Sequence, residues 1–304
     1  MSEMSQSSQD YLCIRRALGY KLKGEGQLLK SFVDFLDGLG ECTITTDSAV
    51  SWTRLAKTAS PPYQARRMRV VRNFARYLKA IDPRTEVPPN DLFPNHKYRP
   101  TPYIYSNAEI QALMIASRTL LPELRAATYE TLIGLLASTG MRIGEAMALD
   151  REDINWSDGL LVIREAKFNK SREVLLHTST IKTLGTYAAG RDLLCLYSST
   201  PSFFVSTRGT RLARNTVDWT FRSLVTKTIP SPKHCHIHAL RHTFAVNTLL
   251  RWYRDGSDIE TRMPLLSTYL GHGDPRATYW YLSAVPELLS LATERLERYM
   301  GERS

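Results

Sequence analysis

The sequence lacks long hydrophobic runs and a leader-like N-terminus. No stretch approaches the about 18 uninterrupted apolar residues that mark a membrane-spanning helix. The longest apolar window, 131–137, lies inside an amphipathic segment. The first ten residues are polar and rich in serine, and they carry neither the basic nor the apolar region of a secretory signal. We therefore expect a chain with no membrane partner.

Cysteine is scarce and is not arranged for metal binding. The four cysteines lie far apart with no CxxC spacing: Cys13, Cys42, Cys195 and Cys235. They indicate reduced thiols in a cytoplasmic protein. The run at 234–238 contains three histidines, but it lacks the ligand spacing of a zinc site, and the HExxH pattern is absent. We expect neither a metal ion nor another cofactor.

Acidic residues are in the minority. The 304 residues include 40 Lys and Arg against 30 Asp and Glu, which gives a net charge of +10. Such a surplus on a folded protein favours a polyanionic partner, usually nucleic acid. Hydrophobic residues make up 43% of the chain, which excludes a disordered or disulfide-stapled chain. The length suggests two domains.

A helix predicted over 63–80 has cations on one side only. At about 100° per residue, Val71, Phe74 and Leu78 share an apolar face. Five cations occupy the other face, with no acid between 64 and 81: Arg66, Arg69, Arg72, Arg76 and Lys79. A solvated face usually mixes signs, so this face favours contact with a DNA backbone over ordinary solvation.

Proline separates two regions of the chain. Six prolines lie between 82 and 102, and because proline blocks helices and sheet ladders, we predict an extended segment there. We place the first domain at 1–95, a linker at 96–105 and the second domain at 106–304. The second domain begins with a capping box at Ser106 and Glu109. Two strands at 160–163 and 173–176 interrupt its helices, so the sequence predicts a mainly α protein with a small antiparallel sheet.

Four local patterns in the second domain carry side chains for chemistry on an anion. Arg142 and Glu145 follow a glycine that ends a helix. Lys167 and Lys170 occupy the connection between the two predicted strands. The segments HALRH at 238–242 and LGH at 270–272 follow in order. Each pattern is weak alone, because a structural ion pair or a turn lysine would look the same.

Taken together, these patterns resemble the tyrosine recombinase (phage integrase) superfamily, which includes the Xer resolvases and the integron and transposon integrases. The matching motifs are TGMRIGEAMAL at 139–149, HALRHTFA at 238–245 and LGHGDPRATYWYL at 270–282. The resemblance implies that 1–95 is a helical core-binding domain that clamps DNA. It also implies that 106–304 is a catalytic domain with a C-terminal helix.

By the same resemblance, three residues bind the phosphodiester. Arg142 and Arg241 would hold the non-bridging oxygens, because two guanidiniums offer paired donors of fixed geometry. His272 would hydrogen-bond the phosphate. Glu145 would orient Arg142 rather than react. Lys170 would contact the DNA backbone.

Three further residues would carry out the reaction. Tyr281 is the expected nucleophile, and His238 is the expected acceptor of its proton. Lys167 would protonate the departing 5′ oxygen. The product would be a 3′-phosphotyrosyl link and a free 5′ hydroxyl, and no ATP or metal would be needed, because the link conserves the energy of the phosphodiester bond.

Some alternatives stay open at this stage. Tyr279 also lies near the motif, but on a helix it points about 200° away from Tyr281, and the family's nine-residue interval from His272 selects Tyr281. The leading function is a site-specific recombinase acting on double-stranded DNA sites, with a homotetramer as the synaptic form. A DNA-binding protein that keeps the fold without cutting is the alternative. The apolar helix expected after 286 would dock on a neighbouring protomer or pack on its own domain.

Overall fold

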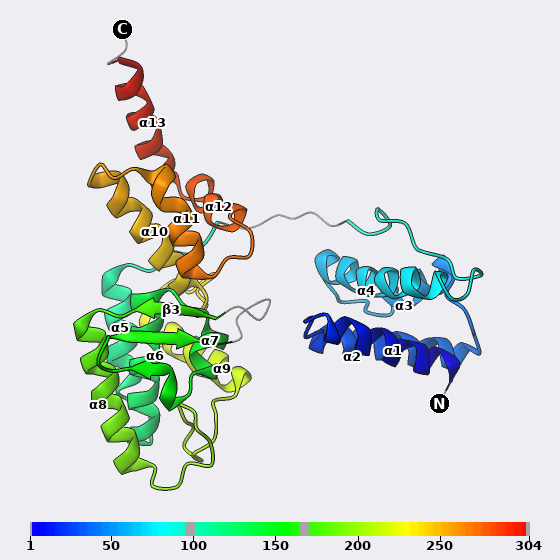
Figure 1. The fold of residues 1–304 in the computed structure, drawn as a ribbon, viewed down its shortest axis with the longest axis horizontal. Coiled ribbons are helices and arrows are strands. Elements are labelled where there is room, and N and C mark those ends of the chain that lie inside the picture. Colours follow the sequence, from blue (N-terminus) through cyan, green and yellow to red (C-terminus); the bar gives the residue numbers. More distant parts are fainter. Residues whose placement is uncertain (1, 95–100, 165–170, 302–304) are drawn as a thin grey trace. The chain divides into compact units, whose positions relative to one another are not determined.

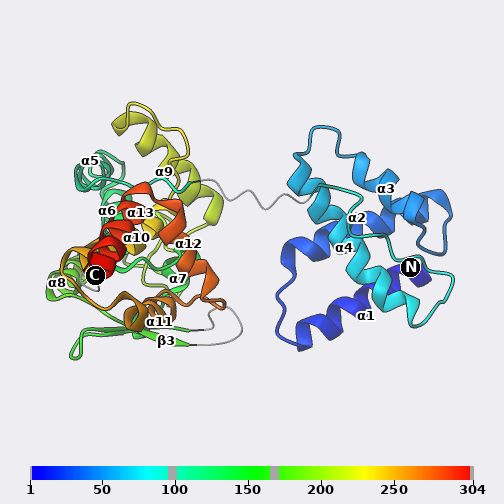
Figure 2. The same ribbon diagram turned by 90° about the horizontal axis from the view of Figure 1, so that it is seen from above.

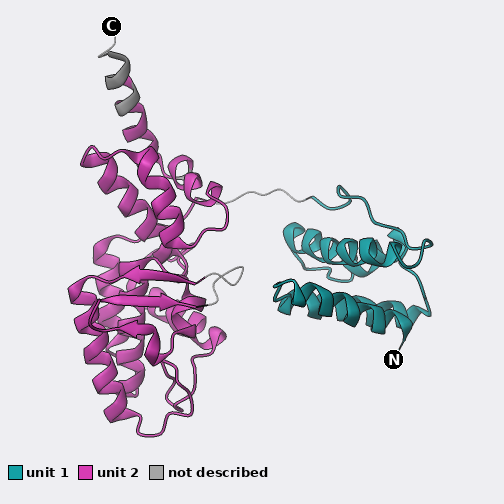
Figure 3. Ribbon diagram, in the orientation of Figure 1, with its two compact units in different colours: residues 1–99 teal, residues 100–304 magenta. Residues whose placement is uncertain are grey.

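The computed structural model describes residues 2–94, 101–164 and 171–301 (Figure 1; Figure 2 gives a second view). The chain divides into two compact units, residues 1–99 and 100–304, which are coloured separately in Figure 3. No helix within the described ranges is both long enough and apolar enough to cross a membrane. Each unit has its own hydrophobic core.

Unit 1 is helical throughout its regular structure. Within residues 2–94 it contains α1 (Glu3–Ala17), α2 (Lys23–Leu39), α3 (Thr46–Arg54) and α4 (Pro61–Lys79). The helices pack around large side chains such as Phe32 and Trp52, whose rings meet edge to face with their centroids 5.2 Å apart. Phe74 of α4 is fully buried in the same core. Burial of these aromatic side chains fixes which face of α4 points inward.

One of the five cations that the sequence analysis assigned to the exposed face of α4 does not face solvent. Arg72 is only 8% exposed. Its Nε donates to the carbonyl oxygen of Pro88 at 2.7 Å, and its Nη2 donates to that of Pro89. A guanidinium can be buried here because these carbonyls, which lack strand partners, accept its hydrogens. The expectation that Arg72 contacts DNA is wrong for this side chain, which holds the segment after α4 in place.

Unit 2 is mostly helical and carries one small sheet. Its helices are α5 (Asn107–Ser117), α6 (Glu123–Thr139), α7 (Ile143–Ala148), α8 (Thr178–Leu194), α9 (Arg214–Thr228), α10 (Ala239–Arg254), α11 (Ile259–Leu270), α12 (Arg276–Ala284) and α13 (Pro286–Gly301). A short 3₁₀ turn, η1 (Arg151–Asp153), precedes the sheet. The predicted fold class, mainly α with a small antiparallel sheet, is confirmed.

The sheet has three antiparallel strands in the order β1-β2-β3. They are β1 (Ile154–Asn155), β2 (Leu160–Ile163) and β3 (Arg172–Leu175). Leu161 pairs with Val174, and both side chains are buried, so the inward faces of β2 and β3 match in register. The pairing also brings Ile163 opposite Arg172, so β3 begins at a defined position beside α11, with which it is in contact.

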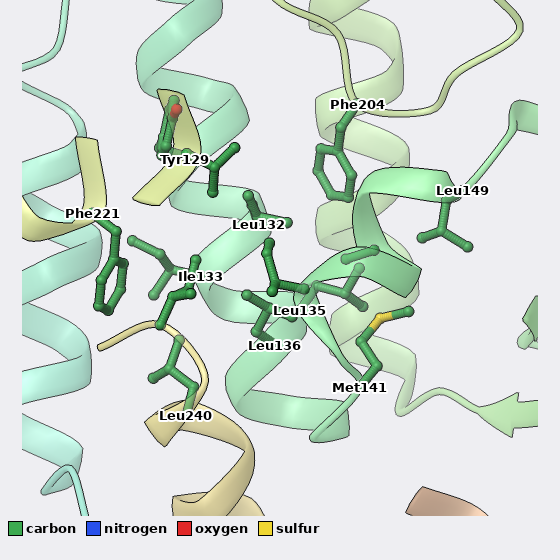
Figure 4. Close-up of a cluster of buried hydrophobic side chains, with 14 of the residues drawn as sticks. Tyr129, Leu132, Ile133, Leu135, Leu136, Met141, Leu149, Phe204, Phe221 and Leu240 are labelled. Atoms are coloured by element: carbon green, nitrogen blue, oxygen red, sulfur yellow. The ribbon is translucent and has the colours of Figure 1, made fainter. Parts of the chain in front are cut away.

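Helix α6 contributes several large side chains to the buried cluster shown in Figure 4. Leu132, Ile133, Leu135 and Leu136 are all at most 2% exposed, because α5, α8 and α10 pack against this helix. Gly140 then ends α6 with φ +61°, a left-handed conformation that favours glycine. A Cβ atom at this position would collide with the ring of Phe244. The buried helix and its glycine cap therefore fix the start of the segment that carries Arg142.

The described end of the predicted linker packs on unit 2. Tyr105 is 1% exposed, and its backbone N–H donates to Oγ1 of Thr243 at 2.9 Å. Its ring meets Tyr103 edge to face, with the centroids 4.9 Å apart. These two tyrosines add apolar surface to the core, so the described residues from Thr101 onward belong to unit 2.

Candidate active site

The motif residues of unit 2 come together where five elements meet. Arg142 caps α7, Arg241 lies in the first turn of α10, and Tyr281 lies in α12. The C-terminal end of α11 and the first residue of β3 complete the site. Both views show α10, α11 and α12 side by side (Figures 1 and 2), and these helices are in contact.

Arg142 is held by two acceptors. Its Nη1 donates to Oε1 of Glu145 and its Nη2 donates to the carbonyl oxygen of Gly271, each at 2.7 Å. Its backbone N–H also donates to Oε2 of Glu145 at 2.9 Å, which closes a capping box at the start of α7. The side chain remains 29% exposed, so its guanidinium is oriented but still accessible to a ligand.

Arg241 is the buried partner of Arg142. It is 2% exposed, and it donates from Nη1 to the carbonyl oxygen of Gly140 at 2.9 Å and from Nη2 to that of Leu270 at 2.7 Å. Burial, followed by the charge of Arg142, lowers the pKa of Arg241 to about 10, which leaves it charged at neutral pH. The neighbouring carbonyls of Leu270 and Gly271 thus each accept a hydrogen bond from one guanidinium. Two cations are fixed on one backbone corner and form a site suited to an anion.

Glu145 is shared by two arginines. Its carboxylate accepts from Arg142 and also from Arg172, whose Nη2 lies 2.7 Å from Oε2. Burial alone would raise the pKa of Glu145, but a hydrogen bond and the charge of Arg172, followed by hydrogen bonds from Arg142, hold it below its usual value. Glu145 is therefore ionised and acts as an acceptor. The sequence analysis did not identify Arg172, because its partner lies 27 residues away.

Tyr281 is buried and hydrogen-bonded to a histidine. It is 1% exposed, and its hydroxyl oxygen lies 2.9 Å from Nδ1 of His242. Tyr279, by contrast, is 48% exposed. The two tyrosines face in different directions, as their spacing on α12 predicts. Trp280 covers His242, with the ring centroids 5.9 Å apart.

The histidine beside the Tyr281 hydroxyl is not the one that the sequence analysis selected. His238 is partly buried, and its ring centroid lies 4.8 Å from that of His242. Burial, followed by the charge of Arg241, lowers the pKa of His238 to about 4, so its imidazole is neutral at pH 7. The signal for His242 was present in the HALRH motif, because residues four apart on a helix share a face.

His272 follows the left-handed residue that ends α11, Gly271, with φ +67°. Its Nδ1 lies 2.6 Å from Oγ1 of Thr278, which is fully buried. The contact orients the imidazole from the first turn of α12. His272 is thus adjacent in sequence to the carbonyl that holds Arg142.

The structure does not join the remaining predicted site residues to this cluster, because they either lie outside the described residues or belong to unit 1. Lys167 and Lys170 lie outside the described residues. On unit 1, Arg66 forms an ion pair with Glu25 at 2.9 Å. Arg69, Arg76 and Lys79 are exposed on α4. In the ranges 2–94, 101–164 and 171–301, no three His, Cys, Asp or Glu side chains cluster as a metal site.

The profile of the phage integrase family matches residues 104–287, which is more than half of the chain and includes every described residue of the site. Curated relatives extend the match over unit 1. The y4rB protein of Sinorhizobium fredii strain NGR234, named as a candidate integrase/recombinase, is 39% identical over 314 residues and spans 100% of both chains. The tyrosine recombinase XerC of Lacticaseibacillus casei is 30% identical over 82% of this chain and 80% of its own.

Solved structures share the fold. The XerA recombinase is 26% identical, with a TM-score of 0.52 over 99% of both chains. The Tn1549 transposon integrase, solved in complex with transposon right end DNA, has a TM-score of 0.68 at 16% identity, over 96% of this chain and 98% of its own. The XerH recombinase, solved bound to a palindromic difH substrate, has a TM-score of 0.66 at 17% identity, over 90% of this chain and 78% of its own.

Proposed function

The chain belongs to the phage integrase family, and on that premise we propose that it is a site-specific recombinase that breaks and rejoins DNA strands through a 3′-phosphotyrosyl intermediate. One observation carries the proposal: Arg142 and Arg241 are fixed on neighbouring carbonyls in the same cluster as the buried hydroxyl of Tyr281. A phosphodiester bound by both guanidiniums would have its developing negative charge stabilised by donors that are already in place.

In the proposed cleavage step, the oxygen of Tyr281 attacks the phosphorus and the bond to the 5′ oxygen breaks. The tyrosine proton passes first to Nδ1 of His242, the group that contacts the hydroxyl. Neutral His238 lies beside His242 and Arg241, where its imidazole can accept a hydrogen bond or a proton close to the bound phosphodiester. His272 is proposed to donate to a phosphate oxygen.

Lys167 is proposed to protonate the departing 5′ oxygen, which becomes the free 5′ hydroxyl. The new bond joins the 3′ phosphate to Tyr281, so the energy of the phosphodiester is kept and no ATP is consumed. Attack by the 5′ hydroxyl of another strand then reverses the chemistry and returns the proton to the lysine. Because two guanidiniums supply positive charge at the phosphate, we propose that no metal ion takes part.

Double-stranded recombination sites are the proposed partner. Arg66, Arg69, Arg76 and Lys79 of unit 1, together with Lys170 of unit 2, are proposed to contact the DNA backbone. A homotetramer is the proposed synaptic form. Leu288 in the first turn of α13 is fully buried against its own unit, whereas Leu289 is 48% exposed. Among the described side chains of α13, the exposed face that includes Leu289 is therefore the candidate for contact with another protomer.

End-labelled DNA tests this function and its polarity. The purified chain is incubated with a duplex from the ends of its own element, in EDTA and without nucleotide, and the reaction is stopped with SDS. A label at the 5′ end of the cut strand should migrate with the protein, and a label at the 3′ end should appear on a free fragment. A mobility shift in native gels with no covalent band would favour the non-cleaving DNA-binding alternative.

A further inference from the structure

Arg172 connects three segments of the site. As the first residue of β3, it donates from Nη1 to Oε1 of Glu145 at 3.1 Å and from Nη2 to Oε2 at 2.7 Å. Its Nε donates to the carbonyl oxygen of Tyr269, near the end of α11, at 2.9 Å. One guanidinium thus ties β3 to the start of α7 and to the end of α11.

The ion pair between Arg172 and Glu145 is largely shielded from water. The side chains are 11% and 10% exposed, so the two parallel hydrogen bonds form a buried bidentate pair. Arg172 also does more than Arg142 to lower the pKa of Glu145. Both oxygens of the Glu145 carboxylate, which accept from the side chain and the backbone N–H of Arg142, are therefore also bound by Arg172.

Arg172 also lies directly against the backbone corner that carries both guanidiniums. A Cβ atom built on Gly271 would approach Nη1 of Arg172 to 2.6 Å. The carbonyl of Gly271 holds Arg142, and that of the preceding Leu270 holds Arg241. The Arg172 guanidinium therefore supports Arg142 from two sides, through Glu145 and through the corner at 269–271.

We propose that Arg172 is a positioning residue for phosphate binding: it fixes Arg142 through Glu145 and the 269–271 corner, without touching the DNA. This inference rests on the proposed function, because it assigns Arg172 a share in strand cleavage. If the ion pair only stabilised the fold, its loss would reduce the folded population, but the loss would not act selectively through Arg142.

A double-mutant cycle distinguishes positioning from general stabilisation. Arg172→Ala, Arg142→Lys and the double variant are compared with the parent for the rate of covalent adduct formation, corrected for the folded fraction. Arg172→Ala should slow the adduct by about 10²-fold, because small displacements of a phosphate-binding group have effects of that size. In the Arg142→Lys background, Arg172→Ala should slow adduct formation by a much smaller factor, because the guanidinium that Arg172 positions is already absent.

Arg211→Ala is the matched control. Arg211 lies near the other end of α7, where Nη1 donates to the carbonyl oxygen of Met147 at 3.0 Å and Nη2 to Oδ1 of Asp150 at 2.6 Å. Its removal deletes a comparable set of contacts without reaching Arg142. Adduct formation by Arg211→Ala should stay close to the parent rate per folded molecule. A parent rate for Arg172→Ala, or an equal loss in both backgrounds, would overturn the proposal.

Hydrogen exchange on the full chain gives a readout that does not depend on cleavage. The N–H of Arg142 donates to Glu145, so Arg172→Ala should speed its exchange and leave amides in the middle of α6 unchanged. If the parent forms no adduct with any duplex, the proposed function fails, and this exchange result alone decides whether Arg172 positions Arg142. Unchanged exchange at Arg142 would overturn the positioning role.

Discussion

The hydroxyl oxygen of Tyr281 lies 2.9 Å from Nδ1 of His242, and the tyrosine is 1% exposed. The candidate nucleophile is therefore hydrogen-bonded to an imidazole while it is shielded from water. A phenol has a pKa of about 10 and is rarely ionised at neutral pH, so a neighbouring acceptor is what makes it reactive. His242 occupies that position, and under the proposed function α12 would have to expose Tyr281 to the bound phosphodiester.

Replacing His242 should slow cleavage more than replacing the nearby His236. His242→Leu removes the acceptor and should lower the single-turnover adduct rate by about 10² to 10⁴-fold, the usual contribution of general acid–base catalysis. His242→Asn, whose amide can replace the Nδ1 contact, should keep more activity. His236→Leu is the control, because His236 is exposed and its ring centroid lies 6.3 Å from that of His242. Faster cleavage by His242→Leu would mean that the hydrogen bond restrains the tyrosine instead.

The exposed cations of α4 should set part of the salt dependence of DNA binding. Each phosphate contact contributes about −0.9 to the slope of log K against log salt, so replacing Arg69 and Arg76 by Gln should flatten the slope by about two. Arg72→Gln should leave the slope unchanged and lower the free energy of unfolding by about 1–3 kcal/mol, because the carbonyls of buried Pro88 and of Pro89 lose their donor. A flatter slope for Arg72→Gln, with an unchanged slope when Arg69 and Arg76 are replaced, would contradict the burial of Arg72.

The depressed pKa of His238 predicts a pH-dependent stability. Burial, Arg241, His236, Arg142 and Arg214 all lower this pKa, from 6.5 to about 4. Between these values the unfolded chain binds more protons than the folded one, so the free energy of unfolding falls as pH falls from 6.5 towards 4. The contribution is at most about 3 kcal/mol. Urea titrations should show a shallower pH dependence for His238→Gln over that window; an identical slope would contradict a buried neutral imidazole.

Gly140→Ala should destabilise unit 2. The left-handed backbone alone costs a non-glycine residue about 1–2 kcal/mol, and the added Cβ would strike Phe244. Gly144→Ala is the matched control: a Cβ atom added to this helical glycine would have no heavy atom within 4 Å, and alanine there should stabilise α7 by about 0.5–1 kcal/mol. Chemical denaturation compares the two variants. If the Gly140→Ala variant were as stable as the Gly144→Ala variant, the turn between α6 and α7 would tolerate a side chain at position 140.

Local sequence signals predicted the parts of the fold that depend on local chemistry. Ser106 and Glu109 form the expected capping box, with Ser106 N–H donating to Oε2 at 2.7 Å and Glu109 N–H donating to Oγ at 3.2 Å. Gly140 ends α6, and β2 spans the predicted residues 160–163. Backbone hydrogen bonds and φ preferences act within a few residues, so these features can be predicted from residues that are close in sequence.

Contacts between residues that are far apart in the sequence could not be predicted from such local signals. Arg72 lies near the boundary of the apolar face of α4, and its burial depends on carbonyls 16 and 17 residues away. Arg172 and His242 find their partners 27 and 39 residues away. The motifs indicated which side chains belong to one site, but the atom that each side chain contacts depends on how the helices pack.

The covalent adduct of two tyrosine variants tests the central claim most directly. Tyr281→Phe and Tyr279→Phe are each incubated with the same duplex, and SDS-resistant protein–DNA bands are compared with binding in native gels. Tyr281→Phe should form no covalent band yet bind DNA nearly as well as the parent, because it loses a hydroxyl and no positive charge. Tyr279→Phe should still form the band. A covalent band from Tyr281→Phe, or its loss in Tyr279→Phe alone, would contradict the assignment of the nucleophile.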